Sequence, residues 1–356
     1  MTSTVKTKIA MRRKFITNLL LSLLSVTGAF FLAPCSILAG EPGHFNPGVP
    51  SIRDFAVPDP GLYFILYNHG YLTDTFNDRN GNKIQSININ PGPGPGVTLN
   101  LAVDVDIYAL VPVLMWVSDW KILGAKYGAY ISPSFANTSI GASLDTARGF
   151  GGSVRAGSFD VADLFVQPIW LGWSPAHWDF ALGYGFYAPT GRYNTQTMNF
   201  PLLGRSITVA SPDNIGLGFW TNQFQGSGYW YPWADKRMAI GGALTYEVHS
   251  QKEDFNITPG QDLTLNWGIS QYLPLTKDKR LLAEVGPAGY DSWQITDSSG
   301  QGSADTVHEE VHAVGGQLGL SYVPWNLALN FHYLYEYYSE DRFQGQVLGL
   351  NFYIKW

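Results

Sequence analysis

The chain has 356 residues and a formal net charge of −6; aromatic side chains make up 15% of it and charged ones only 14%. The aromatic content excludes a disordered chain, and the acidic balance argues against a nucleic-acid partner, which needs a basic surface. We therefore expect one large ordered domain that does not bind nucleic acid.

The first 40 residues differ in character from the rest. Basic residues are followed by a largely apolar stretch over 15–32, and Ala39 and Gly40 offer small residues for cleavage. This pattern predicts a secretory signal peptide over residues 1–40. A retained signal anchor and a lipoprotein cut before Cys35 are the alternatives. Cys35 is the single cysteine, so a chain cut near Gly40 has neither a disulfide nor thiol chemistry.

Residues 41–59 form a short proline-rich segment, with Pro42, Pro47, Pro50 and Pro58. Proline fixes the backbone and removes a hydrogen-bond donor, so we expect an extended segment. Two placements stay open, a periplasmic lead-in or a segment that folds back into the interior of the following domain.

Strand-like segments then alternate with turns over residues 60–356. Many have apolar side chains at every second position, which is the period of a strand, and most reach the roughly 9–11 residues that cross a bilayer obliquely. The sequence therefore predicts an all-β fold, a transmembrane antiparallel β-barrel of the outer-membrane type with about twelve strands. The predicted spans are 60–76, 97–117, 122–136, 160–173, 178–189, 213–224, 238–251, 261–273, 280–293, 309–323, 327–339 and 345–356.

The connections alternate in length as such a barrel requires. Turns that we assign to the periplasm are short, with the connection 225–237 as the exception, and the outward connections are mostly longer and rich in Gly, Ser, Asn and Asp. A soluble sandwich, the alternative fold, has no reason to keep that alternation. We therefore expect the protein in the outer membrane of a Gram-negative bacterium, with its lipids as partners.

The last strand ends the chain on an aromatic residue. Phe352, Ile354 and Trp356 share its apolar face. A C-terminal aromatic strand is typical of proteins that the barrel assembly machinery inserts, so these three residues are the predicted assembly signal and that machinery a predicted partner.

Polar side chains opposite the apolar faces are expected to line the lumen. They would form an acidic or polar path, or simply pair with lumen arginines and water. The candidates are Asp104, Asp106, Glu247, His249, Asn266, Glu284, Asn330, His332 and Glu336.

Two further stretches attract attention. His308 to His312 matches H-E-x-x-H, which binds zinc only on a helix; here the following residues favour a strand, so we predict no metal site and no cofactor. The aromatic cluster 226–233 is expected to form a girdle at the inner membrane interface, with a stacking platform for a solute as the alternative.

Three stretches carry a family resemblance. They are 58–71, starting Pro-Asp-Pro-Gly-Leu-Tyr-Phe, 163–173, and Phe186-Tyr187-Ala188-Pro189-Thr190-Gly191-Arg192-Tyr193. In this order they resemble the outer-membrane proteins of the "meta-pathway of phenol degradation" family. Arg192, in the strand-end motif Pro189, Thr190, Gly191, Arg192 and Tyr193, is expected to meet a lumen carboxylate or an anionic headgroup, or else to mark a strand end with its turn.

The resemblance implies a channel for passive uptake of small hydrophobic or aromatic molecules, with release through the wall or the lumen. It carries no agreed functional residues over to this chain. No G-x-S-x-G motif is present, so an enzyme is not expected. A barrel that acts on lipids, or a structural or adhesive barrel without conduction, remains the alternative.

Overall fold

A computed structural model describes residues 43–89, 97–146, 151–200, 205–211, 213–300 and 308–356; the predicted signal peptide and Cys35 lie outside them. Strands and one short 3-10 helix make up this part of the chain. They are β1 Gly61–Thr73, β2 Ser86–Ile89, β3 Val97–Ile122, β4 Ala125–Ser132, β5 Phe135–Thr146, β6 Gly151–Val161, β7 Leu164–Trp173, β8 Trp178–Ala188, β9 Thr195–Phe200, β10 Arg205–Ala210, β11 Thr221–Trp230, β12 Met238–His249, β13 Ile257–Thr258, β14 Asp262–Pro274, β15 Leu281–Gln294, β16 Ser299–Gly300, β17 Glu310–Tyr322, η3 Val323–Trp325, β18 Leu327–Glu340 and β19 Gln346–Lys355.

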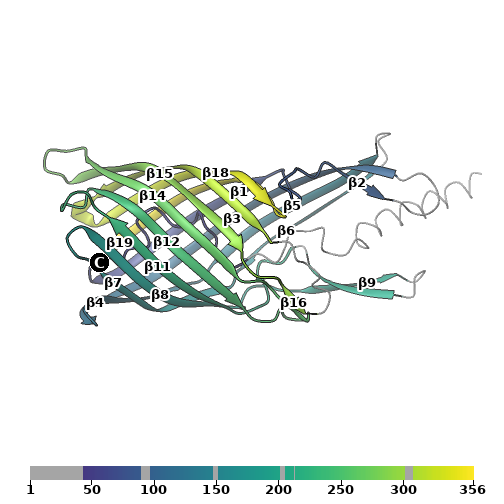
Figure 1. Ribbon diagram of the computed structural model, residues 1–356, viewed down its shortest axis with the longest axis horizontal. Helices are drawn as coiled ribbons and strands as arrows, with labels where there is room; N and C mark the ends of the chain where they lie inside the picture. Colours follow the sequence, from purple (N-terminus) through teal and green to yellow (C-terminus); the bar gives the residue numbers. More distant parts are fainter. Residues whose placement is uncertain (1–42, 90–96, 147–150, 201–204, 212, 301–307) are drawn as a thin grey trace, which may run out of the picture. The chain divides into compact units, whose positions relative to one another are not determined.

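Twelve of the described strands form a closed antiparallel barrel, which confirms the predicted fold. Their order is β1-β19-β18-β17-β15-β14-β12-β11-β8-β7-β4-β3, and β1 closes the circle by pairing with β3. Figure 1 shows these tilted strands, with the C-terminus at one end and β2 and β9 at the other. Closure leaves the barrel without free edges. None of the described helices is long and apolar enough to span a membrane.

The barrel has apolar side chains outside and polar ones inside. Leu182, Leu318 and Leu350 are among the large exposed hydrophobic residues, while Gln167, Gln223 and Asn351 are fully buried. Exposed tryptophans gather at or next to the short turns, as expected of an aromatic girdle at the inner interface. Seven exposed tryptophans belong to this group, Trp116, Trp120, Trp178, Trp230, Trp233, Trp325 and Trp356; exposed Trp220 lies instead at the other end of the barrel, just before β11.

Some predicted boundaries are wrong. The strand expected at 213–224 is β11, Thr221–Trp230, so the connection to β12 is short and the exception among the inner turns disappears. The outward connection expected at 137–159 instead contains most of β5 and β6. β5 pairs with the outer half of the 26-residue β3, and β6 pairs with β5. Gly and Ser in this hairpin suggested a loop because they have low strand propensity, and pairing along β3 overrides that propensity.

The proline-rich segment folds back into the lumen. Its outer end contacts Asp163, which precedes β7, and its inner end reaches Lys126 of β4 through Asp59, 2.8 Å from the lysine ammonium. Val57 packs between these ends against buried residues of β3 and β7. Residues 43–59, called the lumen segment below, therefore run through the barrel from its outer end to its periplasmic end.

Candidate functional site in the barrel lumen

His44 anchors the outer end of the lumen segment. Its Nδ1 lies 2.7 Å from the Thr221 hydroxyl and its Nε2 2.9 Å from Asp163 Oδ2. The imidazole stacks on Tyr187 with 4.6 Å between ring centroids, and Phe219 meets it edge-on at 4.9 Å. Burial lowers the pKa of His44 below its ordinary 6.5, although Asp163 acts in the opposite direction. The ring is therefore held flat between two aromatic side chains and hydrogen-bonded at both edges.

Asp163 connects His44 to the strand-end motif. Its carboxylate accepts the backbone N–H groups of Gly191 and Leu217, each at 2.8 Å. A side chain at Gly191 would lie 2.8 Å from Gly216 Cα and from the Ala162 carbonyl carbon, so the close approach of these loops needs glycine. Three segments distant in sequence therefore meet at one buried carboxylate.

Arg192 takes a partner outside the lumen segment. Its guanidinium forms ion pairs of 3.1 Å with Asp160 and with Asp213. The backbone N–H of Arg192 also bonds to Val161, at the end of β6. Arg192 thus ties the outer loops together, and the carboxylates that it meets are in these loops.

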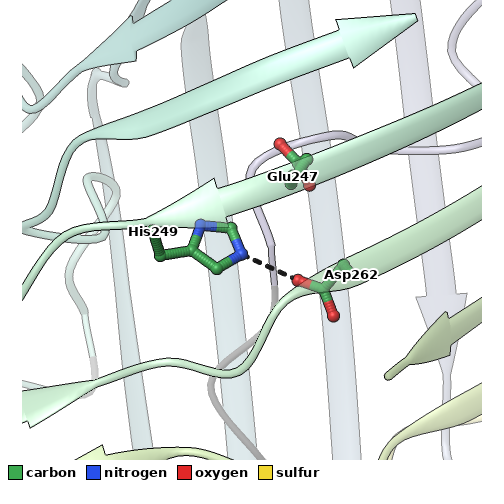
Figure 2. A group of neighbouring side chains, drawn as sticks. All are labelled: Glu247, His249 and Asp262. Atoms are coloured by element: carbon green, nitrogen blue, oxygen red, sulfur yellow. Dashed lines mark hydrogen bonds and ion pairs between the residues drawn. The ribbon is translucent and has the colours of Figure 1, made fainter. Parts of the chain in front are cut away.

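Glu247, His249 and Asp262 form a cluster beside the segment. Figure 2 shows Glu247 and His249 on one strand, β12, and Asp262 on the neighbouring strand, β14, with the His249–Asp262 contact dashed. His249 Nε2 lies 3.0 Å from Asp262 Oδ2, and the ligand atoms of all three side chains lie within 4.8 Å of one another. The Phe45 N–H donates to both oxygens of Glu247, at 3.0 and 3.1 Å.

The middle of the segment is held mostly through its backbone. His332 donates a hydrogen bond to the Gly48 carbonyl. The Ile52 N–H donates to the side-chain oxygen of Gln317, 3.0 Å away, and the Tyr229 hydroxyl donates to the Ile52 carbonyl, 2.6 Å away. A cavity of about 20 Å³ lies between the segment and the wall there. That volume suits about one water molecule, so this part of the lumen is filled.

The inner end of the segment carries a buried charge pair. Arg53 Nε lies 3.3 Å from Glu284 and 2.8 Å from the Ser270 hydroxyl. Its guanidinium also lies 4.2 Å from the ring centre of Tyr272. Because Glu284 is almost fully buried, Arg53 provides the positive charge that its carboxylate needs.

Asp54 adds a titratable contact next to Arg53. Its carboxylate accepts the Ser51 N–H at 2.6 Å and the hydroxyls of Tyr353 and Tyr67 at 2.9 and 3.1 Å. These hydrogen bonds favour the ionised form, but burial outweighs them and raises the pKa of Asp54 to about 7. The docked segment therefore gains or loses a proton near neutral pH.

Aromatic rings follow one side of the lumen in continuous contact. Neighbouring centroids lie 5.9, 5.6, 4.4, 4.6 and 4.9 Å apart. This aromatic row consists of Trp170, Tyr130, Phe165, Tyr187, His44 and Phe219. It runs from the inner half of β7 to the outer end, and its only member from the lumen segment is His44.

Most predicted lumen residues lie inside. Besides Glu247 and His249, this group comprises Asn266, Glu284, Asn330, His332 and Glu336, all buried. Glu336 accepts the hydroxyls of Tyr71 and Tyr290 at 2.8 and 2.7 Å. The hydrogen bonds of Glu284, His332 and Glu336 run to the wall or to the lumen segment.

Asp104 and Asp106 are the exceptions, and the prediction is wrong for both. Val105 between them is 2% exposed, and the unbroken β1–β3 register puts the two aspartates on the outward face, with Asp104 paired to Arg155. The assumption that apolar faces meet lipid fails in this upper part of β3, because its apolar side chains pack inward.

The two remaining stretches follow strand geometry. His312 belongs to β17, with Nδ1 2.7 Å from Asp291 and Nε2 2.6 Å from Glu310, so H-E-x-x-H is not on a helix. The aromatic cluster divides by side: Trp230 is exposed, as a girdle residue should be, but Tyr229 and Tyr231 are buried.

Sequence reasoning missed His44, Arg53, Asp54, Asp163 and Thr221. All five lie outside any motif of known chemistry, and most of their partners are distant in sequence. The separation is 177 residues for His44 and Thr221, 119 for His44 and Asp163, 217 for Arg53 and Ser270, and 299 for Asp54 and Tyr353. Only the proline content of residues 41–59 indicated an unusual segment, and it left the location open.

Thr221, His249 and Asp262 also have the connectivity of a nucleophile–histidine–carboxylate triad. The Thr221 hydroxyl lies 2.7 Å from His249 Nδ1. Thr221 is 0% exposed and its hydroxyl is shared with His44, so a substrate has no approach to it. The geometry therefore favours a structural role for the hydroxyl.

A closed twelve-stranded barrel with an apolar exterior defines the protein as an outer-membrane β-barrel of Gram-negative bacteria, here with an occupied lumen. The family profile described as the MetA-pathway of phenol degradation matches residues 73–352. The chain belongs to this family, as the three motifs predicted.

One solved outer membrane channel shares the fold, and two further structures align with lower scores. An outer membrane channel from Pseudomonas putida F1 aligns with a TM-score of 0.58 at 14% identity, over 88% of this chain and 100% of that one. The β domain of the Bordetella autotransporter BrkA has a TM-score of 0.43 at 11% identity, over 84% and 100%. A Pseudomonas aeruginosa FadL homologue has 0.37 at 12%, over 89% and 95%. No curated protein matches the chain.

Proposed function

We propose that the protein is an outer-membrane channel for passive uptake of small hydrophobic or aromatic molecules. The observation that carries this proposal is the aromatic row. In this row the His44 imidazole lies between Tyr187 and Phe219, and the space that it fills, called the aromatic seat below, fits a flat ring. Family membership and the shared fold of an outer membrane channel support it.

The seat suits an aromatic solute for physical reasons. Stacked and edge-on ring contacts are each worth about 0.5–1.5 kcal/mol beyond the burial of area. An aromatic solute that displaces His44 makes the same stacked and edge-on ring contacts. A polar substituent of the solute meets Thr221 or Asp163, which bind the imidazole at 2.7 and 2.9 Å when His44 is in place. Exchange of one ring for another therefore lowers the cost of moving the segment aside.

The test is uptake by proteoliposomes that contain the folded protein. We expect swelling in small aromatic solutes at a higher rate than in sugars of similar size. Tyr187→Ala removes the stacking face and should lower aromatic uptake. Tyr184→Ala removes the same ring from the same strand, but its hydroxyl bonds to Asn222 and its ring contacts Phe224, away from the row.

Equal uptake by Tyr187→Ala and Tyr184→Ala would contradict the seat, and a preference for sugars would contradict the proposed solute class. Absence of swelling in every solute would favour the structural or adhesive barrel. Turnover of a phospholipid or an ester by the purified protein would instead favour an enzyme.

A further inference from the structure

We propose that Glu247, His249 and Asp262 form a Zn²⁺ site that fastens the outer end of the lumen segment. The three proposed ligands lie outside the aromatic seat, although Thr221 contacts both His44 and His249, and the site does not depend on the proposed transport function. His249 is the last residue of β12 and Asp262 the first of β14, so the cluster lies at the outer rim. Register pairs Glu247 directly with Asp262 across these two strands.

The direction of the hydrogen bonds leaves three acceptors facing one another. Asp163 accepts two backbone N–H groups, so we assign the proton of the His44–Asp163 contact to His44 Nε2. With His44 neutral, its Nδ1 accepts from the Thr221 hydroxyl, and that oxygen in turn accepts from His249 Nδ1–H.

The second nitrogen of His249 then carries a lone pair. It points at Asp262 Oδ2, 3.0 Å away, and Glu247 contributes a further carboxylate. Among the described residues, no lysine or arginine forms an ion pair with Glu247 or Asp262, and Asp262 pairs with His249. Two acceptors at this distance repel unless a proton or a cation lies between them, and a cation satisfies all three side chains together.

The donor set selects the cation. One imidazole nitrogen and two carboxylates suit Zn²⁺ better than Ca²⁺, which takes six to eight oxygen ligands. Ligands about 2.1 Å from Zn²⁺ lie about 3.4 Å apart in a tetrahedron, and the observed atoms lie within 4.8 Å. The Thr221 hydroxyl fixes the ring of His249, as outer partners of metal-bound histidines do.

The same cluster holds the segment. Glu247 accepts the Phe45 N–H, and a Cβ on Gly43 would lie 2.4 Å from Glu247 Oε2 and 2.5 Å from Asp262 Oδ2. The chain therefore passes directly over both carboxylates. Zn²⁺ orients Glu247 toward Phe45 and removes the repulsion between the carboxylates, so binding favours the docked segment.

The test adds Zn²⁺ alone, and Co²⁺ alone as a spectroscopic probe, to the folded full chain in detergent. We expect stoichiometric Zn²⁺ by titration calorimetry and elemental analysis, and a tetrahedral Co²⁺ spectrum. Asp262→Asn and Glu247→Gln should abolish both, and Thr221→Val should weaken Zn²⁺ binding roughly 10- to 100-fold. Chelation should speed maleimide labelling of Pro47→Cys in the lumen segment.

Two control variants locate the ion. His332→Gln removes another lumen histidine that contacts the segment, and His312→Gln removes the surface histidine between Asp291 and Glu310. Both should bind Zn²⁺ as the unmodified chain does. Loss of binding in His312→Gln, equal binding in Asp262→Asn, or no binding by the unmodified chain would overturn the proposal. Should Glu247→Gln fail to fold, Asp262→Asn and Thr221→Val keep it testable.

Discussion

Replacing Arg53 by glutamine should release the inner end of the lumen segment. The change removes the 3.3 Å ion pair with Glu284 and the guanidinium that lies 4.2 Å from the ring centre of Tyr272. Glu284 stays buried, with the Ser270 hydroxyl and the Gln317 amide as its remaining partners. The variant therefore leaves a carboxylate in the lumen without its cation.

The size of the effect follows from burial. Breaking a buried pair costs about 3–5 kcal/mol; because the Arg53 side chain is 17% exposed and Glu284 keeps two hydrogen bonds, we take about 3 kcal/mol. At 1.4 kcal/mol per factor of ten, the undocked population rises roughly 100-fold. Removing both charges with Glu284→Gln in addition should recover much of this loss, since the buried charge is then absent.

Two assays report the change. A cysteine at Ala56, which packs beside Phe55 and Tyr229, should react with a bulky maleimide faster in the Arg53→Gln background, and single-channel recordings should show longer open periods. Arg280→Gln is the control, because its ion pair with Asp278 is exposed and should change neither readout. Unchanged labelling and conductance in Arg53→Gln would refute the idea that this pair holds the segment.

Two other perturbations address the pH dependence and the outer end. The pKa of Asp54 is about 7 in the docked segment and 3.8 in water, so docking is strongest at low pH and weakens as the pH rises through 7. Maleimide labelling of Ala56→Cys should therefore increase from about pH 5 to about pH 8. Asp54→Asn should abolish that increase. Gly191→Ala forces apart backbone atoms that lie 2.8 Å from the new Cβ, so it should speed labelling of Pro47→Cys. Gly226→Ala is the control, because its Cβ meets only a leucine methyl at 3.8 Å and should leave the labelling rate unchanged. A flat pH profile, or equal labelling in the two glycine variants, would count against these assignments.

The alternating residue pattern is enough to predict the barrel. Alternation of apolar and polar residues assigns one face of most strands to lipid, because a one-residue slip would move every side chain to the opposite face. That reasoning located Glu247, His249 and His332 inside. It failed for Asp104 and Asp106, because in this part of β3 the apolar side chains pack inward and Val105 is buried.

The contents of the lumen depend on contacts that form only in the folded chain. His44 contacts Thr221 and Asp163 at sequence separations of 177 and 119 residues, and Arg53 contacts Ser270 at 217. Local propensity carries no information about such pairs, since each side chain alone is an ordinary polar residue. Closure of the barrel brings the inner faces of its strands around one axis. Polar groups buried there need partners, and the lumen segment supplies them through its backbone and its charged side chains.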